Sequence, residues 1–353
     1  MTDAAVLDLS GAQPYPSTAA RRVWQQAANA AAAEPDAWQT APPAGDPALV
    51  EQIAAWCGVP ADELAITAGV RAASARLAVG TRRVLVEAPT FAGVPETLTD
   101  LGCEVSLVPW DDLPSEQERV EPDLVWLTAP CRNPDGATID AATLERIAAA
   151  PGRLVINETY RWFAPPPAQV SGCLSVGGFH KLLGGGARVG WIHDPTGQRP
   201  SASQRASSPA RLLQRTWAWV IRTGGLDALL SAATEPVQAA RAAFHHALGV
   251  TDAGGSAAPF LLLAVAPHRE EVAILARLHR AGVRVGAGSA FHTTLPSIRV
   301  CFTSVTTAEA YHAGQLIRPY LDRGELLLTE TDQHPTHPAT TRPTTVPSEK
   351  DQM

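Results

Sequence analysis

The segment GGFHKLLGGGARVGW, residues 177–191, sets Lys181 between two groups of glycines and follows it with Arg188. Lysine is rare in this chain, because only Lys181 and Lys350 are lysines among the 28 residues that are lysine or arginine. A codon bias toward arginine that spared one lysine by chance is the simple explanation. The alternative is that position 181 requires a primary amine, since a guanidinium stays protonated and forms no Schiff base. Lys181 is therefore a candidate catalytic residue.

Short apolar runs alternate with helical segments on both sides of Lys181. This alternation predicts an α/β fold in which a mostly parallel sheet is covered by helices on both faces. We expect strands at residues 64–69, 83–89, 104–110, 123–130, 153–159, 173–181 and 187–193. We expect helices at residues 21–35, 46–58, 70–79, 91–102 and 142–152. Asp46 and Gly58 are typical of the beginning and the end of the second helix.

The organisation changes after a segment rich in serine, arginine and proline at residues 197–210. A long helical stretch is expected at residues 209–248, and the strands and helices that follow it predict a smaller α/β lobe. The chain is thus expected to have four parts: residues 1–45 as an N-terminal arm and first helix, 46–210 as the large domain, 211–328 as a connecting helix and small domain, and 329–353 as a disordered tail. The last part is rich in threonine and proline and poor in apolar residues.

Composition excludes several classes of function. A net charge of −7 gives no basic field for nucleic acid. No apolar stretch approaches the ~20 residues that cross a bilayer, and the N-terminus lacks the features of a secretory signal. Five cysteines without CxxC spacing indicate reduced thiols in a cytoplasmic protein. The ten histidines show no ligand spacing, so no metal site is expected.

Candidate site residues follow the expected strands, because ligands bind beyond the carboxyl ends of the strands in open parallel sheets. Gly69 at a helix start lets backbone N–H groups meet a phosphate, and Arg71 adds positive charge. Phe91 is an aromatic residue that could stack on a cofactor ring. The candidates after the remaining strands are Asn133, Asn157, Tyr160, Lys181 and Arg188. Their order, with the single lysine among them, favours one shared site.

These motifs resemble, in the same order, those of fold-type I pyridoxal-phosphate enzymes, specifically the class I/II aminotransferase family. The resemblance covers about residues 7–325. The matching segments are Thr67-Ala68-Gly69 for TxG, Pro89-Thr90-Phe91 for P-[ST]-[YFW], Asn133-Pro134-Asp135-Gly136 for NPTG, Asn157-Glu158-Thr159-Tyr160 for D-E-x-Y, Phe179-His180-Lys181 with Arg188-Val189-Gly190-Trp191 for F-S-K…R-x-G-[YW], and residues 288–303, GSAFHTTLPSIRVCFT, for G-x-x-F…R-[IL]-S-F.

The resemblance implies an aminotransferase-like fold, pyridoxal 5'-phosphate as the cofactor and a homodimer. It implies that Lys181 forms the internal aldimine and that Arg299 clamps the α-carboxylate of an amino-acid substrate, with Asn133 beside it. It implies that Gly69, Val70, Arg71 and Arg188 hold the cofactor phosphate and that Phe91 stacks on the cofactor ring. It also implies that Asn133 and Tyr160 contact the phenolic oxygen of the cofactor and that Asn157 faces its ring nitrogen. Lys181 and Tyr160 are the expected catalytic residues.

The chain departs from the family pattern at several of these positions. Asn157 stands where the family has an aspartate that pairs with the pyridinium nitrogen. A carboxylate about 3 Å away contributes on the order of 5 kcal/mol of attraction at an effective dielectric near 20. An amide cannot supply it, so the ring nitrogen is expected to lose its proton more readily and the ring to withdraw electrons less. Hydroxyls that hold the phosphate in the family are replaced by Val70, Gly178 and His180.

Three functions remain open at this stage. The first is a transamination of an α-amino acid, in a specialised biosynthetic pathway. The second is a decarboxylase or C–X lyase on the same scaffold, because the NPDG turn at residues 133–136 and the short chain are similar to the threonine-phosphate decarboxylases of cobalamin synthesis. The third is a degenerate scaffold without turnover. Retention of Lys181, Tyr160, Arg188 and Arg299 favours an active enzyme, and the first function is the one we predict.

Overall fold

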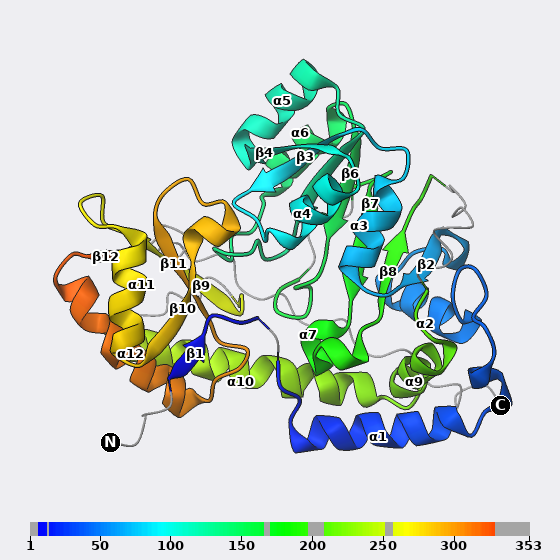
Figure 1. The fold of residues 1–353 in the computed structure, drawn as a ribbon. Helices are drawn as coiled ribbons and strands as arrows, with labels where there is room; N and C mark the ends of the chain where they lie inside the picture. The colour runs from blue at the N-terminus through cyan, green and yellow to red at the C-terminus, as the bar shows by residue number, and fades with distance from the viewer. Residues whose placement is uncertain (1–5, 13, 166–169, 197–207, 251–256, 329–353) are drawn as a thin grey trace.

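Two sheets form the framework of the protein, and each expected strand lies in one of them (Figure 1). The computed structural model describes residues 6–12, 14–165, 170–196, 208–250 and 257–328. The strands are β1 (Leu7–Leu9), β2 (Leu64–Thr67), β3 (Arg83–Ala88), β4 (Glu104–Pro109), β5 (Leu124–Thr128), β6 (Arg153–Asn157), β7 (Leu174–Gly178), β8 (Gly190–His193), β9 (Phe260–Val265), β10 (Val283–Ala287), β11 (Ser297–Cys301) and β12 (Leu326–Leu328).

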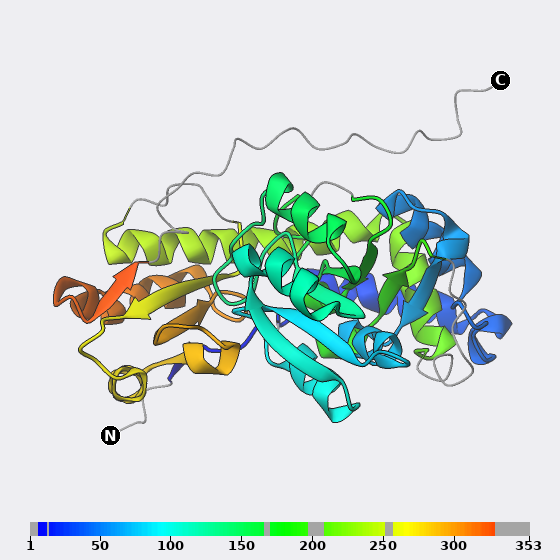
Figure 2. The same cartoon turned by 90° about the horizontal axis from the view of Figure 1, so that it is seen from above.

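Helices cover both sheets (Figures 1 and 2). They are α1 (Thr18–Ala32), α2 (Pro47–Cys57), α3 (Val70–Ala78), α4 (Gly93–Asp100), α5 (Leu113–Val120), α6 (Ala141–Ala149), α7 (His180–Leu183), α9 (Arg211–Arg222), α10 (Gly225–Leu248), α11 (Glu271–Arg280) and α12 (Thr307–Asp322). In the part of the chain that the structure describes, no helix is both long enough and apolar enough to span a membrane. The predicted tail at residues 329–353 and most of the segment at 197–210 lie outside the described residues.

The large sheet has the strand order β2-β8-β7-β6-β5-β3-β4. Its strands are parallel except β8, which runs antiparallel to both β7 and β2. The predicted parallel sheet is therefore correct for all strands but one. Every residue of β5 is buried, as its continuous apolar run requires in a sheet covered on both faces. The carboxyl ends of β5, β6 and β7 lie side by side at one edge.

The small sheet has the order β1-β10-β11-β9-β12. Strands β9 to β12 pair antiparallel, and β1 pairs parallel with β10, with Leu7 opposite Val283. The N-terminal arm thus begins as a strand of the C-terminal lobe. The predicted domain limits at residues 45, 210 and 328 stay a prediction.

The helical stretch expected at residues 209–248 consists of two helices, α9 and α10. Gly224 lies between α9 and α10 with a φ of +72°, a conformation that favours glycine and ends the first helix. Helix α10 then contacts α12 beside the small sheet and α7 beneath the large one (Figure 1). It therefore connects the element that carries Lys181 to the C-terminal lobe.

An aromatic cluster lies under the lysine segment. Phe179 is fully buried, with its ring stacked on Trp217 at 4.2 Å between centroids and on Trp162 at 5.6 Å. Trp191 packs against Phe179 and also covers Gly177, where an added Cβ would lie 2.2 Å from the indole ring. Glycine is therefore required at position 177. This packing fixes the end of β7, from which Lys181 follows.

Candidate active site

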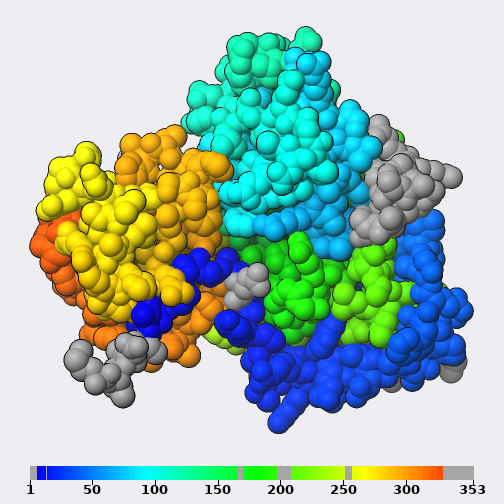
Figure 3. Space-filling view, viewed as in Figure 1, coloured from blue at the N-terminus to red at the C-terminus, as the bar shows by residue number. Residues whose placement is uncertain are grey.

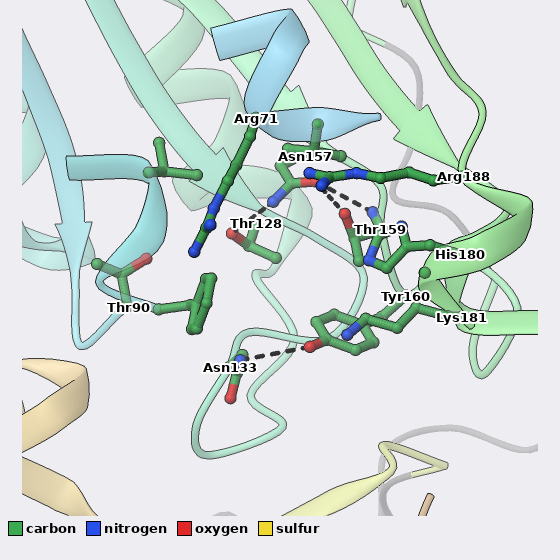
Figure 4. Close-up of a pocket in the computed structure, with 14 residues that line it drawn as sticks. Arg71, Thr90, Thr128, Asn133, Asn157, Thr159, Tyr160, His180, Lys181 and Arg188 are labelled. Carbon is green, nitrogen blue, oxygen red and sulfur yellow. Dashed lines mark hydrogen bonds between the residues drawn. The ribbon is translucent and has the colours of Figure 1, made fainter. Parts of the chain in front are cut away.

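A pocket lies at the carboxyl edge of the large sheet, where the sequence placed the site (Figure 4). Its lining comes from the ends of β5 and β6, from the segments after β3, β5 and β6, from α4 and the starts of α3 and α7, and from the segment before β8. The lining residues are Val70, Arg71, Thr90, Phe91, Val94, Thr128, Asn133, Asn157, Thr159, Tyr160, His180, Lys181, Gly185 and Arg188. Among the predicted site residues, only Gly69 and Arg299 do not line it, and each contacts a residue that does. No group of histidine, cysteine and acidic side chains among the described residues is arranged to hold a metal.

Lys181 lies at the start of α7 and is 8% exposed. Its Nζ donates a hydrogen bond of 2.7 Å to the carbonyl oxygen of Ala12 and lies 5.2 Å from the centre of the Tyr160 ring. Burial, together with the charges of Arg299 and Arg188, lowers the pKa of Lys181 to about 8. A lysine of this kind is neutral in a substantial fraction near physiological pH, and the neutral amine is the nucleophile.

Two arginines enter the pocket from different elements, Arg71 from α3 and Arg188 from the residues before β8 (Figure 4). Neither has a carboxylate partner in the described ranges. Burial, and then the charge of Arg71, lowers the pKa of Arg188. Gly69 lets this guanidinium approach, because a Cβ there would lie 2.7 Å from Arg188 Nε. Gly69 also begins α3 with a φ of +92°, so helix N–H groups and two cations meet at one place, as in anion sites.

His180 borders the same region. Its buried Nδ1 has no hydrogen-bond partner among the described residues. Burial, followed by the charges of Lys181 and Arg188, lowers the pKa of His180 to about 3. The ring is therefore neutral at physiological pH, with one nitrogen carrying a hydrogen. It adds a polar group to the site without adding charge.

The residues at the end of β6 form a hydrogen-bonded chain. Asn157 Oδ1 accepts from the backbone N–H of Thr159 at 3.2 Å and from its hydroxyl at 2.6 Å. Asn157 Nδ2 donates to Thr128 Oγ1 at 3.4 Å. On the other side of the pocket, Asn133 Nδ2 donates to the Tyr160 hydroxyl at 3.3 Å, and burial raises the pKa of Tyr160. The tyrosine is therefore a neutral hydroxyl at physiological pH.

Arg299 lies on β11 and is 3% exposed. It donates to Asn133 Oδ1 at 3.0 Å and to the carbonyl oxygen of Ser10, and its guanidinium lies 4.2 Å from the centre of the Phe291 ring. Its Nε has no partner among the described residues. Asn133, which lines the pocket, thus lies between Arg299 and the pocket and connects the two lobes.

The N-terminal arm crosses the surface between the lobes (Figure 3). Its backbone carbonyls accept hydrogen bonds from two predicted site residues, Ser10 from Arg299 and Ala12 from Lys181. Thr303 donates to the carbonyl of Gly11 between them at 3.3 Å. The arm therefore occupies hydrogen-bond donors of both Arg299 and Lys181.

Sequence reasoning missed several of these residues. Thr128 follows an apolar run directly, which is the signal that identified Asn157, and Thr159 lies two residues after Asn157, but threonines are common at strand ends. His180 was noted only as the loss of a hydroxyl. Ser10 and Ala12 act through backbone carbonyls, so their side chains gave no signal at all.

The protein is similar to aminotransferases in sequence and in fold. 3-Methylarginine biosynthesis aminotransferase ArgM of Streptomyces arginensis is 35% identical over 131 residues, which is 32% of this chain. The match spans about a third of that relative, 35% of its length. Two solved structures give the same fold. Kynurenine aminotransferase of Pyrococcus horikoshii has a TM-score of 0.79 at 19% identity, covering 91% of this chain and 92% of its own. Aspartate aminotransferase of Thermus thermophilus with maleate has a TM-score of 0.74 at 22% identity, covering 89% and 91%.

Both structures confirm the aminotransferase-like α/β fold predicted from the sequence. A model of one protein family matches residues 6–317, which include both sheets except β12 and every predicted site residue. The family is described as aminotransferase class I and II, and the protein belongs to it.

Proposed function

We propose that the protein is a pyridoxal-phosphate-dependent aminotransferase that acts on an α-amino acid in a biosynthetic pathway. The observation that carries the proposal is the buried amine of Lys181, with a pKa lowered to about 8, in a pocket lined by two arginines without carboxylate partners in the described ranges. When bound, pyridoxal phosphate supplies an aldehyde for an amine and a ring that withdraws electrons. The named role of the S. arginensis relative supports the biosynthetic assignment.

The residues of the pocket fit this cofactor. A phosphate would relieve the repulsion between Arg71 and Arg188 and would accept hydrogen bonds from the N-terminus of α3. The partnerless Nδ1 of His180 is a further polar atom of the kind that a bound ligand satisfies. Phe91 borders the pocket and supplies an aromatic face for the ring.

Arg299 is the residue that we assign to the substrate carboxylate. It now donates to one backbone carbonyl and one amide oxygen, both neutral acceptors. A carboxylate is a stronger acceptor for a guanidinium and can accept two parallel hydrogen bonds. Binding of an α-amino acid would therefore displace Ser10 from Arg299 and shift the N-terminal arm. Asn133 stays beside both groups and orients them.

Lys181 is assigned the proton transfer at the substrate α-carbon. Its Nζ lies near the Tyr160 ring and holds the proton at a pKa near the operating pH, which is the condition for efficient general acid–base catalysis. Tyr160, kept neutral by burial, accepts a hydrogen bond from Asn133, so its own hydroxyl hydrogen can be donated to a ligand in the same pocket. The arm over Lys181 limits the access of water to this amine.

The active unit is proposed to be a homodimer in the cytoplasm. Large apolar side chains are exposed around the site and along the N-terminal region: Phe91 is 45% exposed, Tyr15 84% and Trp38 68%. Such exposure suits a surface that a second copy covers. Sedimentation velocity of the purified protein tests the assembly, and a monomer at micromolar concentration would contradict it.

The absorption spectrum of the protein loaded with pyridoxal phosphate tests the activity. A visible band that collapses on borohydride reduction, with pyridoxyl mapped to Lys181, is the expected result. The chain offers a matched control, because Lys350 is its other lysine. Lys181→Ala should remove the reducible band, whereas Lys350→Ala should keep it.

A panel of amino acids then separates the possible reactions. Transamination converts the cofactor to its pyridoxamine form and releases a keto acid, whereas decarboxylation releases carbon dioxide and retains the aldehyde form. A protein that takes up no pyridoxal phosphate would contradict the proposal as a whole.

A further inference from the structure

The amide of Asn157 has a fixed orientation. A backbone N–H can only donate, so the atom 3.2 Å from the Thr159 nitrogen is the amide oxygen. The Thr159 hydroxyl donates to the same oxygen at 2.6 Å. The NH₂ group is therefore the other end of the amide. One of its hydrogens is directed to Thr128 Oγ1 at 3.4 Å, and the second has no acceptor among the described residues.

No carboxylate among the described residues can replace the missing aspartate. The pocket lining contains no aspartate or glutamate. Two acidic residues near these positions in the sequence, Glu87 on β3 and Glu158 after β6, bond to other groups. Glu87 accepts from the backbone N–H of Thr128 at 2.6 Å and from Trp110 Nε1 at 2.7 Å. Glu158 pairs with Arg161 at 2.7 Å. The polar group that β6 presents to the pocket is thus a hydrogen-bond donor.

We propose that Asn157 donates an N–H to the ring nitrogen of pyridoxal phosphate and holds that nitrogen unprotonated, with Thr159 positioning the amide. This inference rests on the proposed function, because it concerns the cofactor of that site. A protonated ring nitrogen would face the NH₂ group hydrogen to hydrogen, whereas a free-base nitrogen accepts from it. The amide cannot rotate to present its oxygen without leaving the Thr159 N–H unpaired in a buried place.

No side chain that lines the pocket favours a protonated ring nitrogen. The titratable groups of the lining are Arg71 from α3, Arg188 from the segment before β8, His180 and Lys181 from α7, and Tyr160 after β6. Burial keeps His180 and Tyr160 neutral, and the two arginines are assigned to the cofactor's phosphate. The described lining therefore holds no anionic side chain that would raise the pKa of a pyridine nitrogen.

A free-base ring changes the demands on the protein. It withdraws electrons less than a pyridinium ring, so it stabilises negative charge at the substrate α-carbon less. More of the reaction then depends on a well-placed base that removes and returns the proton without delay. Lys181, with its amine fixed beside Tyr160, is that base in this chain.

The nitrogen-15 NMR spectrum of the holoenzyme, loaded with pyridoxal phosphate labelled at the ring nitrogen, tests the inference directly. The native protein should give a resonance in the range of free-base pyridine from pH 6 to 9. Asn157→Asp, which places a carboxylate at the same point, should shift the resonance to the pyridinium range. Thr159→Val is the matched control, because it removes a hydroxyl but keeps the backbone N–H that orients the amide, and its resonance should stay in the free-base range.

Two results would overturn the inference while the proposed function stands: a pyridinium resonance in the native protein, or an Asn157→Asp resonance that does not move. Failure of the labelled cofactor to bind would overturn the proposed function, and the inference with it. The readout is independent of turnover, so a variant that is inactive for another reason still answers the question.

Discussion

Lys181 is the residue to which we assign the chemistry, and its environment predicts a pH profile. Burial lowers its pKa from 10.5 to about 8. Below pH 8 the amine is mostly protonated and cannot attack an aldehyde, and above pH 8 it is mostly neutral. The rate at which the cofactor-free protein captures pyridoxal phosphate covalently should therefore rise with pH and level off above about pH 8. Stopped-flow absorbance measures this rate.

Lys181→Ala supplies the control for that experiment, since it should lack the covalent phase while Lys350→Ala retains it. A rate that continues to rise through pH 10 would mean that Lys181 behaves as an ordinary exposed lysine. The burial seen in the structure would then have no effect on its reactivity.

Arg299 allows a second prediction at this scale. Arg299→Lys keeps the positive charge but loses the planar pair of donors that matches a carboxylate. Loss of one charge-assisted hydrogen bond costs about 1.5–3 kcal/mol, which corresponds to a decrease of roughly 10- to 150-fold in kcat/KM. Cofactor affinity should stay the same, because Arg299 does not line the pocket itself. Steady-state kinetics with the best amino acid and a cofactor titration measure the two effects separately.

At the scale of elements, one buried carboxylate joins α2 to α9. Asp46 is 0% exposed and caps α2 through a bond from the Ala48 N–H. Its other oxygen accepts from Arg211 Nε at 2.9 Å and Arg215 Nε at 2.7 Å. Asp46→Asn keeps a capping oxygen but removes the closest counter-charge of two mostly buried guanidinium groups, leaving Arg215 with Glu34 at 3.2 Å and Arg211 with Asp36 at 3.9 Å. We expect a loss of about 3–5 kcal/mol in the free energy of unfolding, measured in urea.

Thr306→Ala is the comparison for this loss. Thr306 caps α12 in a capping box with Glu309, near the surface and without buried ion pairs. Removing that cap should cost about 1 kcal/mol. A loss from Asp46→Asn that is no larger than the loss from Thr306→Ala would show that the ion pairs of Asp46 contribute little.

The sequence predicted those elements whose signals are local. The start of α2 at Asp46 and its end at Gly58 follow from capping preferences, and the structure has both. The break between α9 and α10 was missed, although Gly224 and Gly225 carried a signal for it. The pairing of β1 with β10 joins residues far apart in sequence, and no local pattern contains that information.

The candidate site also divides into residues that local motifs indicate and contacts that only the folded chain creates. Residues recognised by side-chain chemistry in ordered motifs, such as Asn133 and Lys181, lie together in the lining of one pocket, and their roles stay a prediction. The hydrogen bonds to the backbone carbonyls of Ser10 and Ala12 depend on the path of the arm between the lobes, and the side chains of these two residues do not indicate that path. The orientation of the Asn157 amide likewise depends on the fold after β6 and not on residue identity alone.

At the scale of the whole molecule, the family match confirms the predicted class I/II aminotransferase family. The structure adds that one site draws on both sheets and on the N-terminal arm. Lys181 follows a strand of the large sheet, Arg299 lies in the small sheet, and the arm bonds to both. Ligands bound there should therefore stabilise the fold as a unit and not one lobe alone.

Pyridoxal phosphate should accordingly raise the stability of the entire chain. A ligand that binds only the folded state adds about 2.7 kcal/mol at a concentration of 100 Kd. Pyridoxal, which lacks the phosphate, is the matched ligand: it can still react with Lys181 but leaves Arg71 and Arg188 without an anion. Thermal unfolding followed by circular dichroism should give one transition whose midpoint rises with pyridoxal phosphate and much less with pyridoxal. Two separate transitions, with only one responding, would mean that the lobes unfold independently, and equal shifts with both ligands would mean that the arginine pair does not hold the phosphate.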